Sequence, residues 1–267
     1  MVSFTALFTS GLLATTAFAA PVQVQKRSTS KRGAAYNDIT TVSPLASTGA
    51  VSWAYNWDMW LYGVLPSGVS YVPMLRSSSD FGGWFTAIQT ALSSGSEYIL
   101  GFNEPDMTSQ ANMSPSEAAS YYNQYITPYS GQAKLISPAV TSSTTPGMGL
   151  SWFTEFMGSC SSCGITGLAV HWYGNTAEEF ESFVTQAIST AQQYGLSEVW
   201  VSEFALNSDV SGTGDPATTA AFLNTVLPWL DSQDMVSHYS YFMCAENYLL
   251  NGNTLNAAGE AYTSTSS

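Results

Sequence analysis

Two glutamates, each placed where a short apolar run ends, are the residues whose positions most clearly suggest chemistry. Glu104 follows the apolar run at residues 98–102, and Glu203 follows the run at residues 199–201. An ionised carboxylate at the end of a buried strand is costly unless it is paired or neutralised, so packing does not explain either acid. One acid that donates a proton and a second that acts as nucleophile or base are what hydrolysis of a glycosidic bond requires.

The elements that position these acids are short apolar runs that alternate with helical patterns. This alternation is typical of β–α units and a parallel sheet. The predicted strands are residues 51–57, 71–75, 98–102, 134–140, 167–171, 199–204 and 238–243. The predicted helices are residues 82–92, 116–129, 150–157, 177–194 and 217–230.

The predicted strands number seven, one fewer than a barrel of eight β–α units contains. Either the eighth strand lies within residues 33–48, or the early elements of the barrel are trimmed. We therefore expect an α/β fold, a compact (β/α)8 TIM-like barrel that forms a single domain over residues 33–267. In such barrels the chemistry lies at the C-terminal ends of the strands, where both glutamates are expected.

The first 32 residues have the composition of a targeting and processing segment. Residues 1–20 are small and apolar and end in Ala-Phe-Ala-Ala, typical of a signal peptide, although the usual positive start is missing. Residues 21–32 contain two dibasic pairs, Lys26-Arg27 and Lys31-Arg32, that resemble kexin-type processing sites. We expect secretion, a pro-segment over residues 21–32 and a mature start near Gly33; the alternative is a linker that is never cut.

The charge of the chain excludes two classes of partner. Without the pro-segment, the basic residues are Arg76 and Lys134 alone, against 19 acidic residues, which gives a net charge of −17. Such a surface repels nucleic acid and anionic lipid, and no later run of about 18 apolar residues offers a membrane span. We expect a neutral or cationic substrate, no nucleic acid, no membrane and a monomer. Asn112 lies in the chain's single N-x-S/T sequon, so at most one N-glycan is expected.

The three cysteines are Cys160, Cys163 and Cys244. A zinc or redox site at Cys160-Ser-Ser-Cys163 lacks support, because His171 and His238 are scattered rather than at ligand spacing. In an oxidising compartment we expect a local disulfide between Cys160 and Cys163, with Cys244 a buried free thiol; pairing of Cys244 with one of the others stays open. No H-E-x-x-H or phosphate-binding loop occurs, so no metal or cofactor is expected.

Aromatic and amide side chains near the strand ends are candidates for binding sugar. Period-two alternation places Trp53, Tyr55 and Trp57 on one face of their strand, with Trp53 expected in the core. Pyranose rings present C–H faces that stack on aromatic rings, and an uncharged amide satisfies hydroxyls. The predicted substrate-binding residues are Asn103, Tyr55, Asn56, Trp57, Trp60, His171, Trp172, Tyr173, Tyr241 and Glu246.

Three of the polar side chains near these strand ends could have a structural role instead of contacting the sugar. His171 is either a hydrogen-bonded histidine near the core or a ligand of the sugar. Asp106 is expected to cap the loop or helix that follows it. Glu246 is expected to accept a sugar hydroxyl or to act as a structural partner.

Four motifs, taken in order, resemble glycoside hydrolase family 128 in the retaining barrel clan. They are Gly-Phe-Asn-Glu-Pro-Asp at 101–106, Ser-Pro-Ala at 137–139, His-Trp-Tyr at 171–173 and Ser-Glu-Phe-Ala at 202–205. The resemblance covers roughly residues 52–261. It implies that Glu104 is the acid/base and Glu203 the nucleophile. It also implies that Asn103 hydrogen-bonds the sugar 2-hydroxyl and that Tyr173 hydrogen-bonds Glu203.

The resemblance further implies a secreted, internally cleaving hydrolase of β-1,3-glucan polysaccharide or oligosaccharides that works without a metal or cofactor. Alternatives are an exo-acting or β-1,4-directed member of the same clan, and a glucan-binding or oligosaccharide-binding protein on the same scaffold. The presence of both glutamates argues against a protein that only binds.

Overall fold

The computed structural model describes residue 1 and residues 30–264. The predicted signal peptide, residue 1 aside, and most of the predicted pro-segment therefore lie outside the described residues. Within the described part of the chain, no helix is long and apolar enough to cross a membrane.

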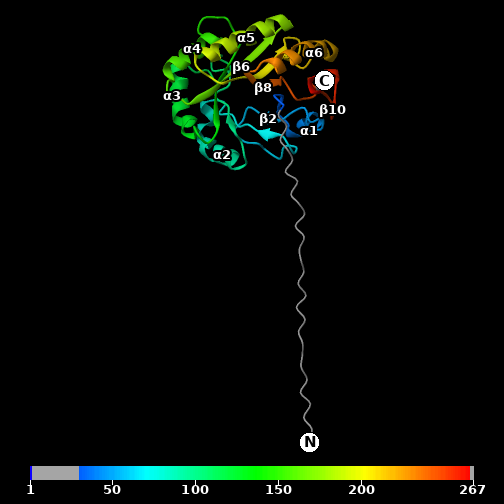
Figure 1. Cartoon of the computed structure of the whole chain (residues 1–267), viewed down its shortest axis with the longest axis horizontal. Coiled ribbons are helices and arrows are strands. Elements are labelled where there is room, and N and C mark those ends of the chain that lie inside the picture. Colours follow the sequence, from blue (N-terminus) through cyan, green and yellow to red (C-terminus); the bar gives the residue numbers. More distant parts are fainter. Residues whose placement is uncertain (2–29, 265–267) are drawn as a thin grey trace.

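Two parallel sheets make up the centre of the fold (Figure 1). The first contains β1 (Gly33–Ala35), β2 (Trp53–Tyr55) and β3 (Ser70–Tyr71) in that order. The second contains, in sequence order, β4 (Tyr98–Ile99), β5 (Lys134–Val140), β6 (Ile165–Gly174), β7 (Glu198–Leu206) and β8 (Val236–Tyr241), and it curls into a half-barrel. Each of the seven predicted strands overlaps one of these strands, and β1 lies within residues 33–48, where the sequence allows an eighth strand.

Isolated parallel bridges connect the two sheets at both sides. Met74 pairs with Leu100 between β3 and β4, and Arg32 pairs with Tyr239 between β1 and β8. The backbone N–H of Tyr239 donates to the carbonyl of Lys31 at 2.9 Å. The parallel α/β architecture is thus as predicted, and a complete barrel of eight β–α units stays a prediction.

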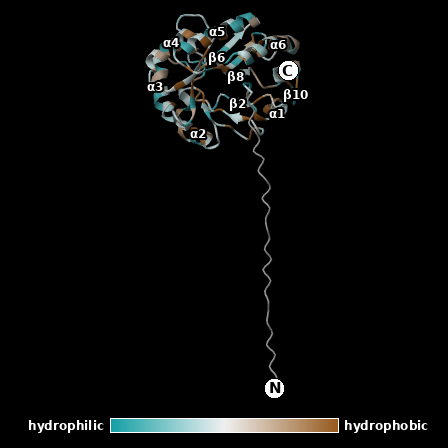
Figure 2. Cartoon of the chain, viewed as in Figure 1, coloured by the Kyte–Doolittle hydropathy of each residue, from teal (hydrophilic) through white to brown (hydrophobic). Residues whose placement is uncertain are grey.

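Helices cover the outer side of the curled sheet (Figure 1). Their bounds are α1 (Val42–Ala46), α2 (Phe81–Ser93), α3 (Pro115–Tyr125), α4 (Gly149–Ser159), α5 (Ala177–Gln193), α6 (Pro216–Ser232) and α7 (Ala257–Thr263). Short 3-10 helices span Ile39–Thr41, Ser78–Asp80 and Thr127–Tyr129, and a hairpin of β9 (Leu250–Asn251) and β10 (Thr254–Leu255) precedes α7. Hydrophobic and hydrophilic residues alternate along the peripheral helices, as amphipathic helices require (Figure 2).

One connection departs from the β–α pattern, because residues 56–69, between β2 and β3, contain no helix. This is the early trimming that the sequence left open. The loop matters for function because its first residues reach the ends of the strands.

Helix ends follow local sequence signals. Ser114 accepts the backbone N–H of Glu117 at the start of α3, and Thr176 and Glu179 form a capping box at the start of α5. The helix predicted to run to residue 129 ends earlier, at Tyr125, with Pro128 in the 3-10 turn beyond it. Proline has no N–H for the helical ladder, which explains this difference.

Side chains alternate between two cores along each strand. Trp53, Tyr55 and Trp200 belong to a core inside the curled sheets, and a larger core fills the space between strands and helices. On β6, Ala169 points inward whereas Val170 belongs to the outer core. This alternation decides which residues near the strand ends can reach a common site.

The cysteine prediction is confirmed. Cys160 and Cys163 form a disulfide just after α4, and Cys244 is a buried free thiol whose Sγ–H donates to the carbonyl of Thr41. Burial raises the pKa of Cys244 to about 12, so this thiol is not a nucleophile at neutral pH.

Candidate active site

Glu104 and Glu203 lie side by side, Glu104 beyond the C-terminal end of β4 and Glu203 in the C-terminal half of β7. Both are buried, with 7% and 5% of their surface exposed. Glu104 follows β4, and its backbone N–H donates to the carbonyl of Ala139 at 2.8 Å. Its φ of 43° lies in the left-handed region, which is unusual outside glycine. A register shift between β6 and β7 sets Glu203 opposite His171, since Val170 pairs with Val201 and the next pair omits Ser202.

His171 stands between the two carboxylates and is fully buried. Its Nδ1 lies 2.9 Å from Glu104 Oε1, and its Nε2 lies 3.4 Å from Glu203 Oε1 and 3.1 Å from Ser202 Oγ. The ligand atoms of these two acids and this histidine all lie within 4.8 Å of one another. His171 is thus a hydrogen-bonded residue of the site itself.

Glu203 accepts a hydrogen bond on each oxygen. Trp57 donates its indole N–H to Oε1 at 2.6 Å, and Tyr173 donates its hydroxyl to Oε2 at 2.5 Å. The hydrogen bond from Tyr173 is the one that the family resemblance implied. These two hydrogen bonds fix the orientation of the Glu203 carboxylate, which suits a nucleophile.

Burial and the charges of the two acids shift the pKa values of the side chains around them. Burial lowers the pKa of His171, but the carboxylates of Glu203 and Glu104 outweigh it, so the pKa lies above its usual value. Burial, followed by the charge of Glu203, raises the pKa of Tyr173 and of Tyr55 far above the usual range. Both phenols therefore remain hydrogen-bond donors at any working pH.

The two acids open onto a cleft of about 570 Å³. Five predicted substrate-binding residues line this cleft: Asn103, Asn56, Trp57, His171 and Tyr173. The cleft is completed by Asn37, Asp58, Arg76, Met107, Gln110, Thr141, Ser142, Val210 and Phe242. It therefore combines aromatic faces, amides and hydroxyls around the carboxylates, as a sugar site requires.

Other predicted substrate-binding residues lie away from the cleft. Trp172 packs in the outer core against Phe180 and Phe222, because its neighbours on β6 point inward. Tyr241 is buried in the same core and donates its hydroxyl to Asp209. For these two side chains, strand alternation places the ring on the helix side of the sheet.

Two more predicted residues, Tyr55 and Glu246, also lie outside the cleft. Tyr55 is fully buried beneath the cleft and donates its hydroxyl to the carbonyl of Ser202 at 2.9 Å, so it supports the strand that carries Glu203. Glu246 is exposed and accepts the backbone N–H of Gly252 in the β9–β10 hairpin. That contact agrees with the structural alternative for Glu246.

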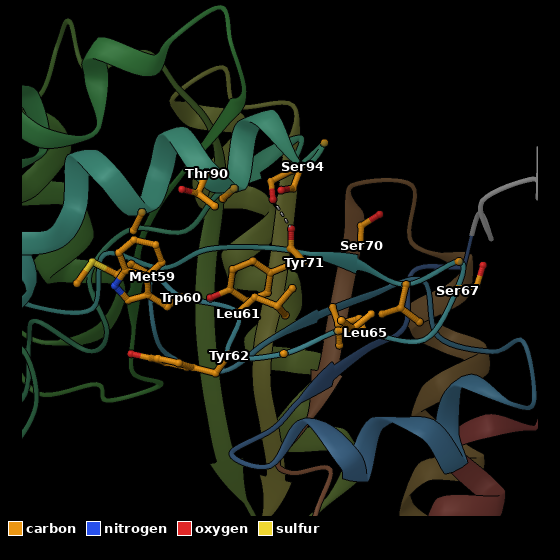
Figure 3. A pocket seen from close by; sticks show the side chains of 18 residues that line it. Met59, Trp60, Leu61, Tyr62, Leu65, Ser67, Ser70, Tyr71, Thr90 and Ser94 are labelled. Atoms are coloured by element: carbon orange, nitrogen blue, oxygen red, sulfur yellow. Dashed lines mark hydrogen bonds between the residues drawn. The ribbon is translucent and has the colours of Figure 1, made fainter.

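Trp60 lines a different concavity of about 720 Å³, here called the outer hollow. Figure 3 shows Met59, Trp60 and Tyr62 at one end of it, Leu65 and Ser67 at the other, and Thr90 and Ser94 of the α2 region above. Its lining residues carry no charge. The loop 56–69 therefore contributes to both concavities, with Trp57 and Asp58 in the cleft and the residues after them in the hollow.

Sequence reasoning missed several cleft residues, including Asp58, Arg76, Gln110 and Phe242. Asp58 and Gln110 lie in loops, whose path has no periodicity to follow. Arg76 could have been suspected, since it comes directly after a predicted strand and is one of few basic residues. Phe242 likewise falls at the end of a predicted strand.

Asn103 is buried in the cleft wall, and its amide N–H donates to Gln110 Oε1 at 3.3 Å. Among the described residues its Oδ1 has no hydrogen-bond partner. Buried polar atoms are nearly always satisfied, so an unpaired acceptor in a cleft points to a ligand hydroxyl. Asp106, by contrast, is occupied, because it accepts from Thr141 and from the N–H of Gly149 at the start of α4.

Glu104, His171 and Glu203 form a cluster that could in principle hold a metal ion. The donors that surround the cluster fit that use poorly. The N–H of Trp57 and the O–H of Tyr173 already point at the two oxygens of Glu203, where a cation would have to bind. These contacts fit two carboxylates that act on a substrate directly.

Comparison with known proteins identifies the family of this chain. The family described as glycosyl hydrolase catalytic core matches residues 33–262. The chain belongs to this family. The similarity to glycoside hydrolase family 128 is thereby confirmed, since the similar solved structures are β-1,3-glucanases of that family.

One similar structure is a curdlan-specific exo-β-1,3-glucanase of subgroup III from Blastomyces gilchristii, solved in complex with glucose. It is 40% identical to this chain, with a TM-score of 0.83, and the match covers 90% of this chain and 100% of that chain. An endo-β-1,3-glucanase of subgroup II from Sorangium cellulosum is 28% identical with a TM-score of 0.73, covering 88% and 98% of the two chains. A subgroup I endo-enzyme from Amycolatopsis mediterranei, bound to laminaritriose, is 26% identical with a TM-score of 0.73 and the same coverage.

A curated relative is also detected, alkali-sensitive linkage protein 1 of Schizosaccharomyces pombe. It is 32% identical over 197 residues, which are 72% of this chain. The matched part is 34% of that relative, so the chain spans about a third of its length.

Proposed function

We propose that this member of the glycosyl hydrolase catalytic core family hydrolyses β-1,3-glucan with retention of configuration. The observation that carries the proposal is the pair of buried carboxylates, Glu104 and Glu203, whose nearest oxygens lie within 4.8 Å. Retaining glycosidases hold their two carboxyl groups roughly 5–5.5 Å apart, whereas inverting ones leave about 6.5–9.5 Å for a water. The separation favours direct attack by one carboxylate.

In the first step an oxygen of Glu203 attacks the anomeric carbon, and the bond to the leaving sugar oxygen breaks. The proton of Glu104 passes to that oxygen. In the second step Glu104, now a carboxylate, takes a proton from water, whose oxygen attacks the same carbon and releases Glu203. Trp57 and Tyr173 hold Glu203 in the orientation for attack. The Oδ1 of Asn103, which has no partner among the described residues, accepts a hydrogen bond from the 2-hydroxyl of the bound sugar.

The scaffold proposed for this chemistry is the (β/α)8 barrel, trimmed at the helix that would follow β2. The bridges from Met74 to Leu100 and from Arg32 to Tyr239 support closure at both sides of the half-barrel. Secretion remains part of the proposal and is supported by the signal-like first 20 residues and the Cys160–Cys163 disulfide. A monomeric state is proposed with it.

The family resemblance favours internal cleavage, and one comparison favours exo action. The exo-acting structure is 40% identical to this chain, whereas the endo-acting ones given above are 26% and 28% identical. Release of glucose from chain ends is therefore the second candidate for the mode of attack.

Time-resolved product analysis tests both proposals. Laminarin-type and curdlan-type β-1,3-glucans are incubated with the protein beside cellulose- and mannan-type polymers. Products from the β-1,3-glucans alone support the substrate class, and products from the β-1,4 polymers alone contradict it. A ladder of oligosaccharides supports endo action, whereas glucose alone from the first time point supports exo action.

A further inference from the structure

The second dibasic pair, Lys31-Arg32, is built into the folded domain. Arg32 is only 4% exposed although it is an arginine near the start of the described chain. Its Nε donates to the hydroxyl of Tyr239 at 2.8 Å, and one terminal nitrogen pairs with Asp231 at 2.9 Å. The other terminal nitrogen donates to the carbonyls of Tyr262, at 2.9 Å, and of Ser264. All of the guanidinium nitrogens are thus used to hold α6, β8 and α7 together.

Lys31 occupies the end of helix α6. Its Nζ donates to the carbonyls of Gln233 at 2.8 Å, Asp231 at 3.0 Å and Leu230 at 3.4 Å. A cation that bonds the last carbonyls of a helix satisfies groups that have no partner within the helix and interacts favourably with its dipole. The lysine therefore caps α6 while the neighbouring arginine pairs with the same helix.

The peptide bonds around the pair are also part of the sheet. The carbonyl of Lys31 accepts from the N–H of Tyr239 at 2.9 Å and from the indole of Trp53 at 3.0 Å, and the carbonyl of Arg32 accepts from the N–H of Ser52 at 3.0 Å. Gly33 begins β1, and a Cβ on it would lie 2.2 Å from the ring of Trp53. An endoprotease binds several residues on both sides of the cut in extended form, which requires these backbone groups to be free.

We propose that Lys31-Arg32 is a structural clasp that stays covalently attached in the mature protein, so that processing, where it occurs, stops upstream of Ser30. The clasp ties the entry of β1 to the C-terminal helices and protects the Arg32–Gly33 bond. A mature start at Gly33, which the sequence favoured, would cut the chain inside a bonded strand. The first pair, Lys26-Arg27, is the other dibasic pair of the N-terminal segment and is left as the processing site.

The test is limited digestion of the full native chain with an endoprotease specific for Lys-Arg pairs, read by intact mass and N-terminal sequencing. A synthetic peptide of residues 22–38 is the reference and is expected to be cut after both pairs. In the native protein we expect cleavage after Arg27, and cleavage after Arg32 at a rate roughly 10³-fold below that in the peptide, because the bond is exposed only on opening. A native product that begins at Gly33 at a rate comparable with the peptide would overturn the proposal.

Two variants separate the clasp from the sequence that the protease reads. Asp231→Asn removes the ion pair of Arg32 but leaves both dibasic pairs intact, and we expect it to raise cleavage after Arg32 and to lower the melting temperature. Lys26→Ala with Arg27→Ala removes the first pair alone. That double variant is expected to stay uncut at its N-terminus and to melt like the parent, and new cleavage after Arg32 in it would contradict the clasp.

Discussion

The cleft and the outer hollow are two concavities that share one loop, and they differ in what converges on them. The hollow is the larger, about 720 Å³ against 570 Å³, and both contain aromatic side chains. The cleft gathers two buried acids and a histidine within 4.8 Å, whereas the hollow is lined without charge. The volume and apolar surface of a concavity therefore do not identify the candidate active site of this protein. The titratable groups that converge near the strand ends identify it.

The largest expected effect comes from the two acids themselves. Glu104→Gln and Glu203→Gln each keep the shape of the side chain but remove the transferable proton or the nucleophile. We expect each to lower the rate of β-1,3-glucan hydrolysis by at least about 10³-fold. Rates on soluble glucan, with circular dichroism to check folding, measure this. Near-normal rates in either variant would remove that residue from the proposed mechanism.

The hydrogen bond from Tyr173 to Glu203 is expected to have the next largest effect. Tyr173→Phe keeps the ring and removes one donor to a charged group, a contact worth about 1.5–3 kcal/mol. We expect kcat to fall by roughly 10- to 100-fold with a smaller change in KM. Tyr122→Phe is the matched control, because that buried hydroxyl donates to the carbonyl of Ile136 away from the cleft. Equal effects on kcat in both variants would show that the loss is only structural.

Protonation of His171 predicts a pH dependence of stability. The carboxylates raise its pKa in the folded state above 6.5, so its contribution is fully present below about pH 6.5 and is lost as the pH rises through the folded-state pKa. Melting temperatures of His171→Gln should differ most from the parent in acid, and the difference should shrink as the pH rises. A difference that is independent of pH would contradict this account.

His238 supplies the opposite case within the same molecule. Burial, with a smaller effect of Lys134, lowers its pKa from 6.5 to about 3. The unfolded chain then binds the proton more readily, so the folded state loses stability as the pH falls from 6.5 towards 3. His238→Gln should therefore gain stability relative to the parent in acid, and the opposite slope would show that His238 is charged in the fold.

Two exposed valines, one in the cleft and one in the outer hollow, give the smallest expected effect. Val210 lines the cleft and Val64 lines the hollow, with 44% and 87% of their surfaces exposed. Val210→Asp is expected to raise KM for glucan by roughly fivefold, which corresponds to about 1 kcal/mol. Val64→Asp adds the same charge and is expected to leave kcat and KM unchanged. An equal rise in KM for both would show that substrate also occupies the hollow.

Much of the fold could be predicted because hydrophobic periodicity is local. The run 134–140 matches β5 residue for residue, since both of its ends are marked by a change of composition. The end of α3 was misjudged because the apolar pattern continues past Pro128. The loop 56–69 had no periodic signal, and its path over two concavities follows from tertiary contacts instead.

The sequence predicted the site residues whose placement depends on their position along a strand. It failed for those whose placement depends on which side of the sheet the side chain faces. Glu104 and Glu203 meet because the ends of parallel strands share one edge. The sequence predicts Trp172 in the cleft together with His171 and Tyr173, and this prediction is wrong because three consecutive strand residues cannot all face the same side. The prediction for Tyr241 is wrong for the same reason, since the next residue, Phe242, faces the cleft instead. Asp58 is not predicted because it lies in a loop without periodicity, whereas Arg76 follows a predicted strand just as the two glutamates do.

The central claim, that two glutamates act by double displacement, is tested most directly by the anomeric form of the first product. Proton nuclear magnetic resonance during the first minutes of β-1,3-glucan hydrolysis distinguishes the two anomers before they equilibrate. The separation of Glu104 and Glu203 predicts that the β-anomer appears first and the α-anomer only by later mutarotation. Initial formation of the α-anomer would mean inversion through a bound water and would contradict the account.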